Sequence, residues 1–143
     1  MERVTGHRAV MSVYYQWTGQ AVRGETIHVG DLNQGRDYTY VADIASGIRA
    51  VLDAPALPHD LYNITAGAWI SFKEILAQLR ELYPTVQVVA ANNQEVQPRF
   101  LEPSRGPLSG HRLHQDLGWS PQYDLARGLA DYLQWRRDAP FLD

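Results

Sequence analysis

Residues 30–45 read GDLNQGRDYTYVADIA and carry the most informative pattern in this 143-residue chain. The two glycines and the polar residues between them are typical of a turn. Arg36 follows the turn and leads into an alternating segment, which predicts a strand over 38–41. Asp43 then opens a helical pattern, which predicts a helix over 43–53 with Asp43 as its N-terminal cap. The apolar residues of that helix are expected to face inward: Ile44, Ile48, Val51 and Leu52.

Outward from this stretch, predicted helices and strands alternate. Apolar spacing predicts a helix over 8–24 that stops at Gly24. Strands are predicted over 26–29, 61–65 and 86–90, a loop over 92–108, and a short helix over 109–117 that ends at Gly118. A final helix is predicted from Asp124, with Leu125, Leu129 and Leu133 on its inner face.

The clearest helix start in the chain is Ser71, because Glu74 follows at the spacing of a capping box. Ile70 and Ile75 can form a hydrophobic staple around it. The buried face of this helix is predicted to consist of Phe72, Ile75, Leu76 and Leu79, with Pro84 beyond its end. The whole pattern predicts one mixed α/β domain over residues 1–143, without a repeat or a clean domain boundary.

Composition excludes several classes of protein. A net charge of −3 and a pI near 5.9 argue against a nucleic-acid partner. The absence of cysteine excludes disulfides and thiolate metal sites, and the five histidines show no metal-ligand spacing. No apolar run approaches the length of a membrane span and no signal peptide is recognised, so we expect a cytoplasmic protein without a membrane partner.

With LYNIT at 61–65, the stretch GRDYTYVADIA resembles the C-terminal, substrate-binding part of the extended short-chain dehydrogenase/reductase family. That family includes NAD-dependent nucleotide-sugar epimerases, dehydratases and decarboxylases. The resemblance covers roughly residues 1–138, and MERVTGHR at 1–8 is similar to a family stretch that commonly follows a Tyr-Gly-Pro segment. It implies an α/β substrate-binding portion that lacks the N-terminal Rossmann half.

Two motifs of such an enzyme do not occur in this sequence. No glycine-rich turn of the type that cradles a dinucleotide is found. The family's catalytic tyrosine needs a lysine four residues later, but the single lysine here, Lys73, is preceded at that spacing by Trp69. The resemblance therefore implies no catalytic residue and no bound cofactor in this chain alone, with NAD as the cofactor of the full-length family.

The resemblance also implies the substrate-binding residues. In the family, the arginine of the Arg-Asp-aromatic run contacts the nucleotide diphosphate, and Arg36 occupies that position; a guanidinium offers a rigid fork of donors to phosphate. The alternative is a solvated arginine paired with Asp31 or Asp37. Relatives usually have glycine where Leu32 stands, so the turn can differ here.

Three further residues complete the predicted site. Arg105 lies in SRGPLS at 104–109, which is similar to the Arg-x-Pro-Asp run of decarboxylases and dehydratases, although a surface position is the alternative. Arg99 in the same loop is a further candidate. Tyr38 faces either the nucleotide or the core. Asp43 and Asn63 are expected to be structural.

The function predicted from the sequence is the binding of a nucleoside-diphosphate sugar as one portion of an NAD-dependent epimerase or dehydratase, catalytically incomplete by itself. Two alternatives are a non-catalytic binding or assembly module and an inert fragment of a truncated gene. The expected partners are the nucleotide sugar and either a missing Rossmann half or a second copy of the chain. A homo-oligomer is expected through residues 44–52 or 61–65, whose apolar side chains and backbone groups would lack a cover.

Overall fold

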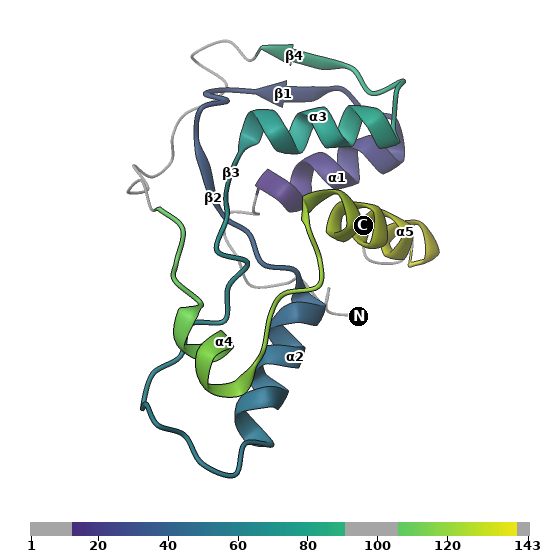
Figure 1. Ribbon diagram of the computed structural model, residues 1–143. Helices are drawn as coiled ribbons and strands as arrows, with labels where there is room; N and C mark the ends of the chain where they lie inside the picture. Colours follow the sequence, from purple (N-terminus) through teal and green to yellow (C-terminus); the bar gives the residue numbers. More distant parts are fainter. Residues whose placement is uncertain (1–12, 91–105, 140–143) are drawn as a thin grey trace, which may run out of the picture.

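The computed structural model describes residues 13–90 and 106–139 of the chain (Figure 1). In order, these residues form α1 (Val13–Arg23), β1 (Ile27–Val29), β2 (Gly35–Asp37), α2 (Val41–Leu52), β3 (Trp69–Ser71), α3 (Phe72–Leu82), β4 (Val88–Ala90), α4 (His111–Leu117) and α5 (Leu125–Asp138). β1 pairs in parallel with β4, whereas β2 pairs antiparallel with β3, placing Arg36 opposite Ile70. The described fold is therefore mixed α/β, as the sequence predicts.

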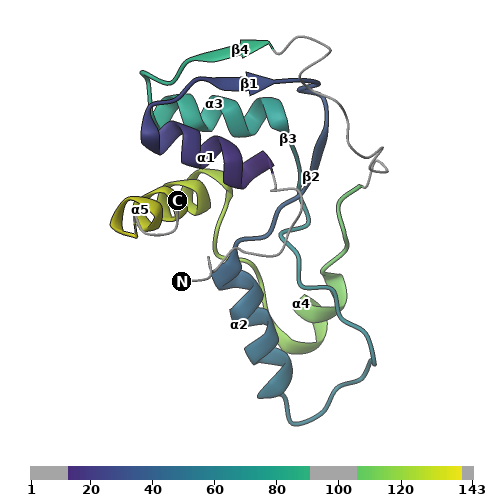
Figure 2. The ribbon, with the colours of Figure 1, turned by 180° about the vertical axis from the view of Figure 1, so that it is seen from behind.

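The elements form two parts. Figure 1 shows β1 and β4 beside α1, α3 and α5 in one part, and α2 with α4 in the other. The β2–β3 ladder runs between them, which Figure 2 confirms from behind. No helix in the described ranges is long and apolar enough to cross a membrane.

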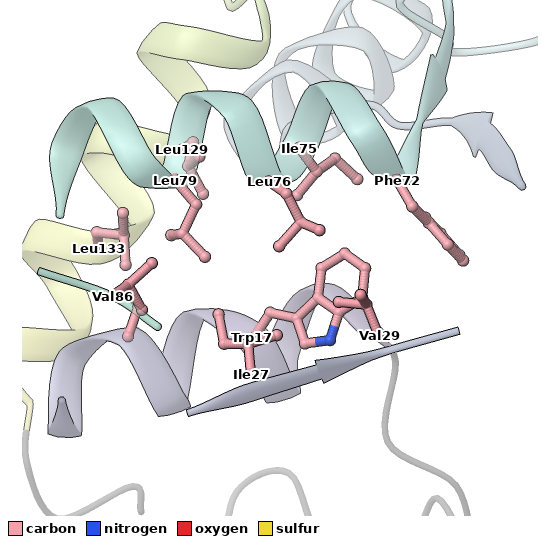
Figure 3. Close-up of a cluster of buried hydrophobic side chains, with 11 residues drawn as sticks. Trp17, Ile27, Val29, Phe72, Ile75, Leu76, Leu79, Val86, Leu129 and Leu133 are labelled. Carbon is pink, nitrogen blue, oxygen red and sulfur yellow. The ribbon is translucent and has the colours of Figure 1, made fainter. Parts of the chain in front are cut away.

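The hydrophobic core lies in the first part, where apolar residues of α1, α3 and β1 meet and α5 packs against both helices (Figure 3). All four residues predicted for the buried face of α3 are buried, and Leu79 is fully enclosed. The Trp17 and Phe72 rings pack edge to face with centroids 5.5 Å apart, a geometry that aromatic pairs favour. Leu129 and Leu133 of α5 close the core from the other side.

The starts of α3 and α5 and the glycine stops of α1 and α4 agree with the predicted local signals. The Ser71 backbone N–H donates to Glu74 Oε2 at 2.7 Å, and the Glu74 N–H donates to Ser71 Oγ at 3.2 Å, which completes the capping box. The Arg127 N–H donates to the Asp124 carboxylate at 2.8 Å and caps α5. Gly24 and Gly118, which follow α1 and α4, have φ of +69° and +66°, a conformation that glycine adopts without strain.

Two predicted strands are wrong. The strand expected over 38–41 lies at Gly35–Asp37 instead, and Val41 already begins α2. Residues 61–65 belong to no strand, and β2 pairs with Trp69–Ser71 just before α3. Gly35 permits this pairing, because a Cβ at that position would lie 2.3 Å from the Ile70 carbonyl oxygen.

The predictions for α2 also need correction. Asp43 lies inside the first turn instead of capping it, and its buried carboxylate accepts the N–H groups of Gln122 at 2.8 Å and Tyr123 at 3.0 Å. The apolar residues expected to face inward do not all do so, since Ile48 is 48% exposed and Leu52 is 78% exposed. The buried positions of the helix are Asp43 and Gly47, so α2 is anchored mainly by a polar contact.

Polar contacts also connect the rest of the second part. The Trp119 indole N–H donates to Ser46 Oγ at 2.9 Å, which holds the segment after α4 against α2. The Asp116 carboxylate of α4 lies 2.8 Å from His59 Nδ1 and accepts the Tyr62 hydroxyl at 2.9 Å. These hydrogen bonds lower the pKa of Asp116.

Leu79→Ala should lower the free energy of unfolding by about 2–5 kcal/mol, because it removes buried methyl groups and leaves a cavity in the core. Urea unfolding followed by circular dichroism measures the change. Leu82→Ala is the matched control on the same helix, since Leu82 is 42% exposed and its truncation should cost less than about 1 kcal/mol. Equal losses from the two substitutions would contradict the assigned core.

Candidate functional site

The Asp37 carboxylate holds together three segments that are distant in the sequence. It accepts the Leu108 N–H at 2.9 Å and the hydroxyl of Thr65, and Thr39 Oγ1 lies 3.5 Å away. Thr39 Oγ1 in turn accepts the Ala66 N–H at 2.9 Å. This network fixes the start of the 106–110 segment against the end of β2.

Arg36 precedes Asp37 on β2 and is partly buried. Successive side chains of a strand point to opposite faces, so Arg36 projects from the face opposite the Asp37 network. Tyr38 follows the last residue of β2. Burial raises the pKa of Tyr38, and the positive charge of Arg36 partly opposes this shift.

A tyrosine-lined pocket of about 830 Å³ begins at Tyr38. We call it the tyrosine pocket. Its walls come from α1, the 38–41 segment, β3, the 121–125 segment and α5, and its aromatic residues are Tyr14, Tyr38, Tyr40, Trp69, Tyr123 and Tyr132. Arg36 lies beside this pocket in the sequence but is not part of its lining.

The rings of the pocket contact one another. The Tyr14 centroid lies 5.8 Å from that of Tyr38 and 5.7 Å from that of Tyr132, and the Tyr40 and Tyr123 centroids are 4.4 Å apart. Tyr40 donates its hydroxyl to the Asp131 carboxylate. Aromatic walls with a few polar atoms suit a flat ring or the apolar face of a sugar.

Tyr14 and Tyr40 of the pocket resist ionisation. Burial is the main cause that raises the pKa of Tyr14 well above the ordinary value of a phenol, and the neighbouring Tyr132 adds to the shift. Desolvation followed by the hydrogen bond to Asp131 raises the pKa of Tyr40 in the same direction. The hydroxyls of both residues are therefore neutral hydrogen-bonding groups at neutral pH.

Of the predicted site residues, Arg36 and Tyr38 are described and lie two positions apart on one side of the chain. Tyr38 packs against the core and also lines the pocket, and its contact with a nucleotide stays a prediction. Arg99 and Arg105 lie outside the described residues. Asn63 has a structural contact, since its side-chain amide donates to the Ser109 carbonyl at 3.1 Å.

Sequence reasoning missed the remaining pocket tyrosines and the linking role of Asp37. One signal was present, because Tyr38 and Tyr40 are spaced as neighbours on one face of an extended segment. Tyr123 and Tyr132 gave no such signal, since their approach to Tyr40 and Tyr14 depends on the position of α5.

Comparison with known proteins finds similar sequences and structures. The model of the NAD dependent epimerase/dehydratase family matches residues 2–65. A dTDP-glucose 4,6-dehydratase of Streptomyces griseus is 31% identical over 106 residues, covering 74% of this chain and 31% of the relative. These matches confirm the predicted resemblance to the extended short-chain dehydrogenase/reductase family and its NAD-dependent epimerases and dehydratases.

Further relatives agree with this assignment. A UDP-glucose 4-epimerase of Mycolicibacterium smegmatis is 27% identical over 138 residues, covering 93% of this chain and 40% of the relative. The structure of MoeE5 in complex with UDP-glucuronic acid and NAD superposes with a TM-score of 0.77 at 22% identity, over 94% of this chain and 44% of that one. The UDP-glucose 4-epimerase of Thermotoga maritima with UDP-glucose gives a TM-score of 0.70 at 22% identity, over 90% and 40%.

The chain spans between 31% and 40% of the length of these curated relatives. The predicted fold class, a portion of an extended short-chain dehydrogenase/reductase, is confirmed by the shared fold and this partial coverage. In this chain, Arg36 and Asp37 project from opposite faces of β2. Asp37 anchors the 106–110 segment by accepting the Leu108 N–H.

Asp37→Ala should lower the free energy of unfolding by about 1–3 kcal/mol, because the substitution leaves the Thr65 hydroxyl and the Leu108 N–H without their acceptor. Hydrogen exchange at the Leu108 amide should accelerate in the same variant. Asp31→Ala is the control, since the Asp31 carboxylate accepts the local N–H of Asn33. Unchanged exchange at Leu108 in Asp37→Ala would show that another contact holds the segment.

Stability should fall in alkaline solution because the pKa of Tyr14 is raised in the folded chain. Unfolded tyrosines titrate near 10, so the folded state binds this phenolic proton more tightly. The contribution is fully present below about pH 10 and is lost as the pH rises toward the raised folded value. Denaturant unfolding at a series of pH values measures this loss.

Tyr14→Phe should flatten the alkaline decline, whereas Tyr15→Phe, at the next position of α1, should leave it in place. Tyrosinate absorbance should show delayed ionisation in the unsubstituted chain. Equal alkaline profiles for the unsubstituted chain and Tyr14→Phe would contradict the assignment.

Proposed function

We propose that this chain binds a nucleoside-diphosphate sugar through Arg36, as the substrate-binding portion of an NAD-dependent epimerase or dehydratase. The observation that carries the proposal is the position of Arg36, which is held in a β-ladder two residues before Tyr38, and Tyr38 lines the tyrosine pocket. A guanidinium fixed by regular structure presents a fork of donors that matches a phosphate. The relatives support the class of ligand, because their names or bound molecules include UDP-glucose, dTDP-glucose and UDP-glucuronic acid.

Arg105 is the second arm of the proposed diphosphate clamp. Leu108, three positions later, donates its backbone N–H to the Asp37 carboxylate, and Asp37 follows Arg36 in the sequence. Arg99 is a further candidate from the same loop, and Tyr38 is the aromatic contact between the clamp and the tyrosine pocket.

We also propose that the chain is catalytically incomplete by itself. Neither a glycine-rich dinucleotide turn nor a tyrosine four residues before a lysine occurs in the 143 residues. Some structures with the same fold contain a nicotinamide cofactor, NAD in MoeE5 and NADPH in RMD of Pseudomonas aeruginosa. Without those two motifs, the residues here hold the substrate, and hydride transfer depends on residues of a complete enzyme.

Calorimetric titration of the purified chain with UDP and dTDP tests the proposal. A diphosphate should bind, and Arg36→Ala should weaken that binding by about 1.5–3 kcal/mol, the range for a charged hydrogen bond. Arg36→Lys should recover part of the loss, because one ammonium cannot reproduce the fork. Arg80→Ala, an exposed arginine on α3, is the matched control and should leave the affinity unchanged.

Two results would oppose the proposal. Unchanged diphosphate affinity in Arg36→Ala would remove this residue from the site. Micromolar binding of NAD by the isolated chain would contradict catalytic incompleteness, since it would require a dinucleotide site that the sequence motifs do not provide.

A further inference from the structure

His59, Tyr62 and Asp116 form a hydrogen-bonded cluster that joins the 57–64 segment to α4. His59 Nδ1 lies 2.8 Å from Asp116 Oδ2, and the Tyr62 hydroxyl donates to the same oxygen at 2.9 Å. The Tyr62 hydroxyl also accepts the His59 backbone N–H at 3.2 Å, and the two rings meet edge to face with centroids 6.0 Å apart. The His59 ring is therefore held in place by Tyr62 and by Asp116 together.

The geometry of this cluster determines which nitrogen of His59 takes up a second proton. The hydrogen bonds from His59 and Tyr62 lower the pKa of Asp116, so its carboxylate is ionised above about pH 4. An ionised carboxylate only accepts hydrogen bonds, which assigns the hydrogen of the neutral imidazole to Nδ1. Protonation then takes place at Nε2, and it adds a positive charge beside the carboxylate without breaking the hydrogen bond.

Helix α4 is short and has a small buried anchor. Of its 7 residues, Leu113 is the buried one. Polar contacts to the 57–64 segment add to this anchor, namely that of Asp116 with His59 and a long one of 3.4 Å from Arg112 Nη1 to the Leu61 carbonyl. A helix with few buried contacts opens locally at a lower free energy than the helices of the core. A change in the strength of one polar contact should therefore alter how often α4 opens.

The charged groups around His59 come from its own segment and from α4. Asp60 lines the same groove of about 510 Å³ as His59, and the positive charge of Arg112 on α4 acts on the Asp116 carboxylate. Helix α2 contributes apolar side chains to the wall of this groove: Ile48, Val51 and Leu52. Asp116 is in direct hydrogen-bond contact with the imidazole, and the interaction between charges falls with distance, so this carboxylate decides the sign of the effect.

We propose that the His59–Asp116 pair is a pH-sensitive latch that holds α4 more firmly when the imidazole is protonated. Protonation turns a hydrogen bond between a neutral ring and a carboxylate into an ion pair, and bonds between two charged groups are stronger. An imidazole titrates near about pH 6.5, so the latch is strongest in mildly acidic solution and weakens as the pH rises. It is lost again below about pH 4, where the Asp116 carboxylate becomes protonated.

The latch lies at one end of a segment that Asp37 holds at the other. Leu108 of the 106–110 segment donates to Asp37, and α4 begins directly after this segment, at His111. The two contacts together fix the chain from β2 to the end of α4. The inference goes beyond nucleotide binding and does not depend on it, because the latch is measured on the chain without a ligand.

Amide hydrogen exchange of the 143-residue chain tests the proposal. Protection factors, which are corrected for the intrinsic exchange rate, are measured by NMR at about pH 5.5 and about pH 7.5, on either side of the ordinary imidazole value. The protection of the α4 amides relative to the α3 amides should be roughly two- to fivefold higher at the lower pH. This is the range for a partly exposed ion pair, and the His59 and Asp116 side chains are 42% and 13% exposed.

Substitutions separate His59 from the other histidines. His59→Gln keeps a side-chain donor but cannot become charged, so it should lose the two- to fivefold difference. Asp116→Asn should lose it as well, because a neutral amide cannot form an ion pair. His28→Gln, at an exposed position of β1, is the matched control and should keep the difference. His111 and His114 lie on α4 and titrate in the same range, so any pH dependence that remains in His59→Gln belongs to them.

Two results would overturn the proposal. One is a ratio of α4 to α3 protection that does not change with pH in the unsubstituted chain. The other is the same pH dependence of this ratio in the unsubstituted chain and in His59→Gln.

Discussion

The buried carboxylate of Asp43 connects the two parts of the molecule. It accepts two backbone N–H groups from the segment that leads into α5, while α2 itself contributes few buried side chains. A buried carboxylate needs hydrogen bonds in place of water, and the N–H groups of residues 122 and 123 provide them. In turn, the carboxylate provides the acceptor that these two N–H groups need. Through this contact, the position of α2 depends on α5, and α5 is fixed by the core.

The same connection builds the tyrosine pocket. The Tyr123 N–H is one of the two groups that Asp43 holds, and the Tyr123 ring is tilted against the ring of Tyr40, which lies just before α2. Asp37 makes a similar connection for the 38–66 segment, because its carboxylate links β2 to Thr65 and Leu108. Two aspartates therefore hold a segment that the hydrophobic core does not enclose, and Tyr38 at the start of that segment packs against the core.

The features that could be predicted from the sequence are those whose interacting residues lie close together along the chain. Helix caps involve residues three apart, so the Ser71–Glu74 capping box and the helix start at Asp124 were predicted correctly. The strands depended on partners far along the chain: Gly35–Asp37 pairs with Trp69–Ser71, and neither segment indicates the other. Asp43 stood where a cap is expected, and its real partners lie about eighty residues away. Of the site, Arg36 and Tyr38 were found through the family pattern, whereas the other pocket tyrosines come together only when α1 and α5 pack.

The antiparallel ladder has a consequence for how this chain can vary. Asp37 pairs with Trp69, so the ladder holds together the two ends of the 31 residues between them. The hydrophobic core is formed by other elements. The entropy of closing such a loop grows only slowly with its length, and a doubling costs about 0.6 kcal/mol. Insertions or deletions between 53 and 61 should therefore leave the core nearly as stable as before. The segment between β2 and β3 can therefore change its length and outer surface over evolution, while the β2–β3 ladder keeps Arg36 in register.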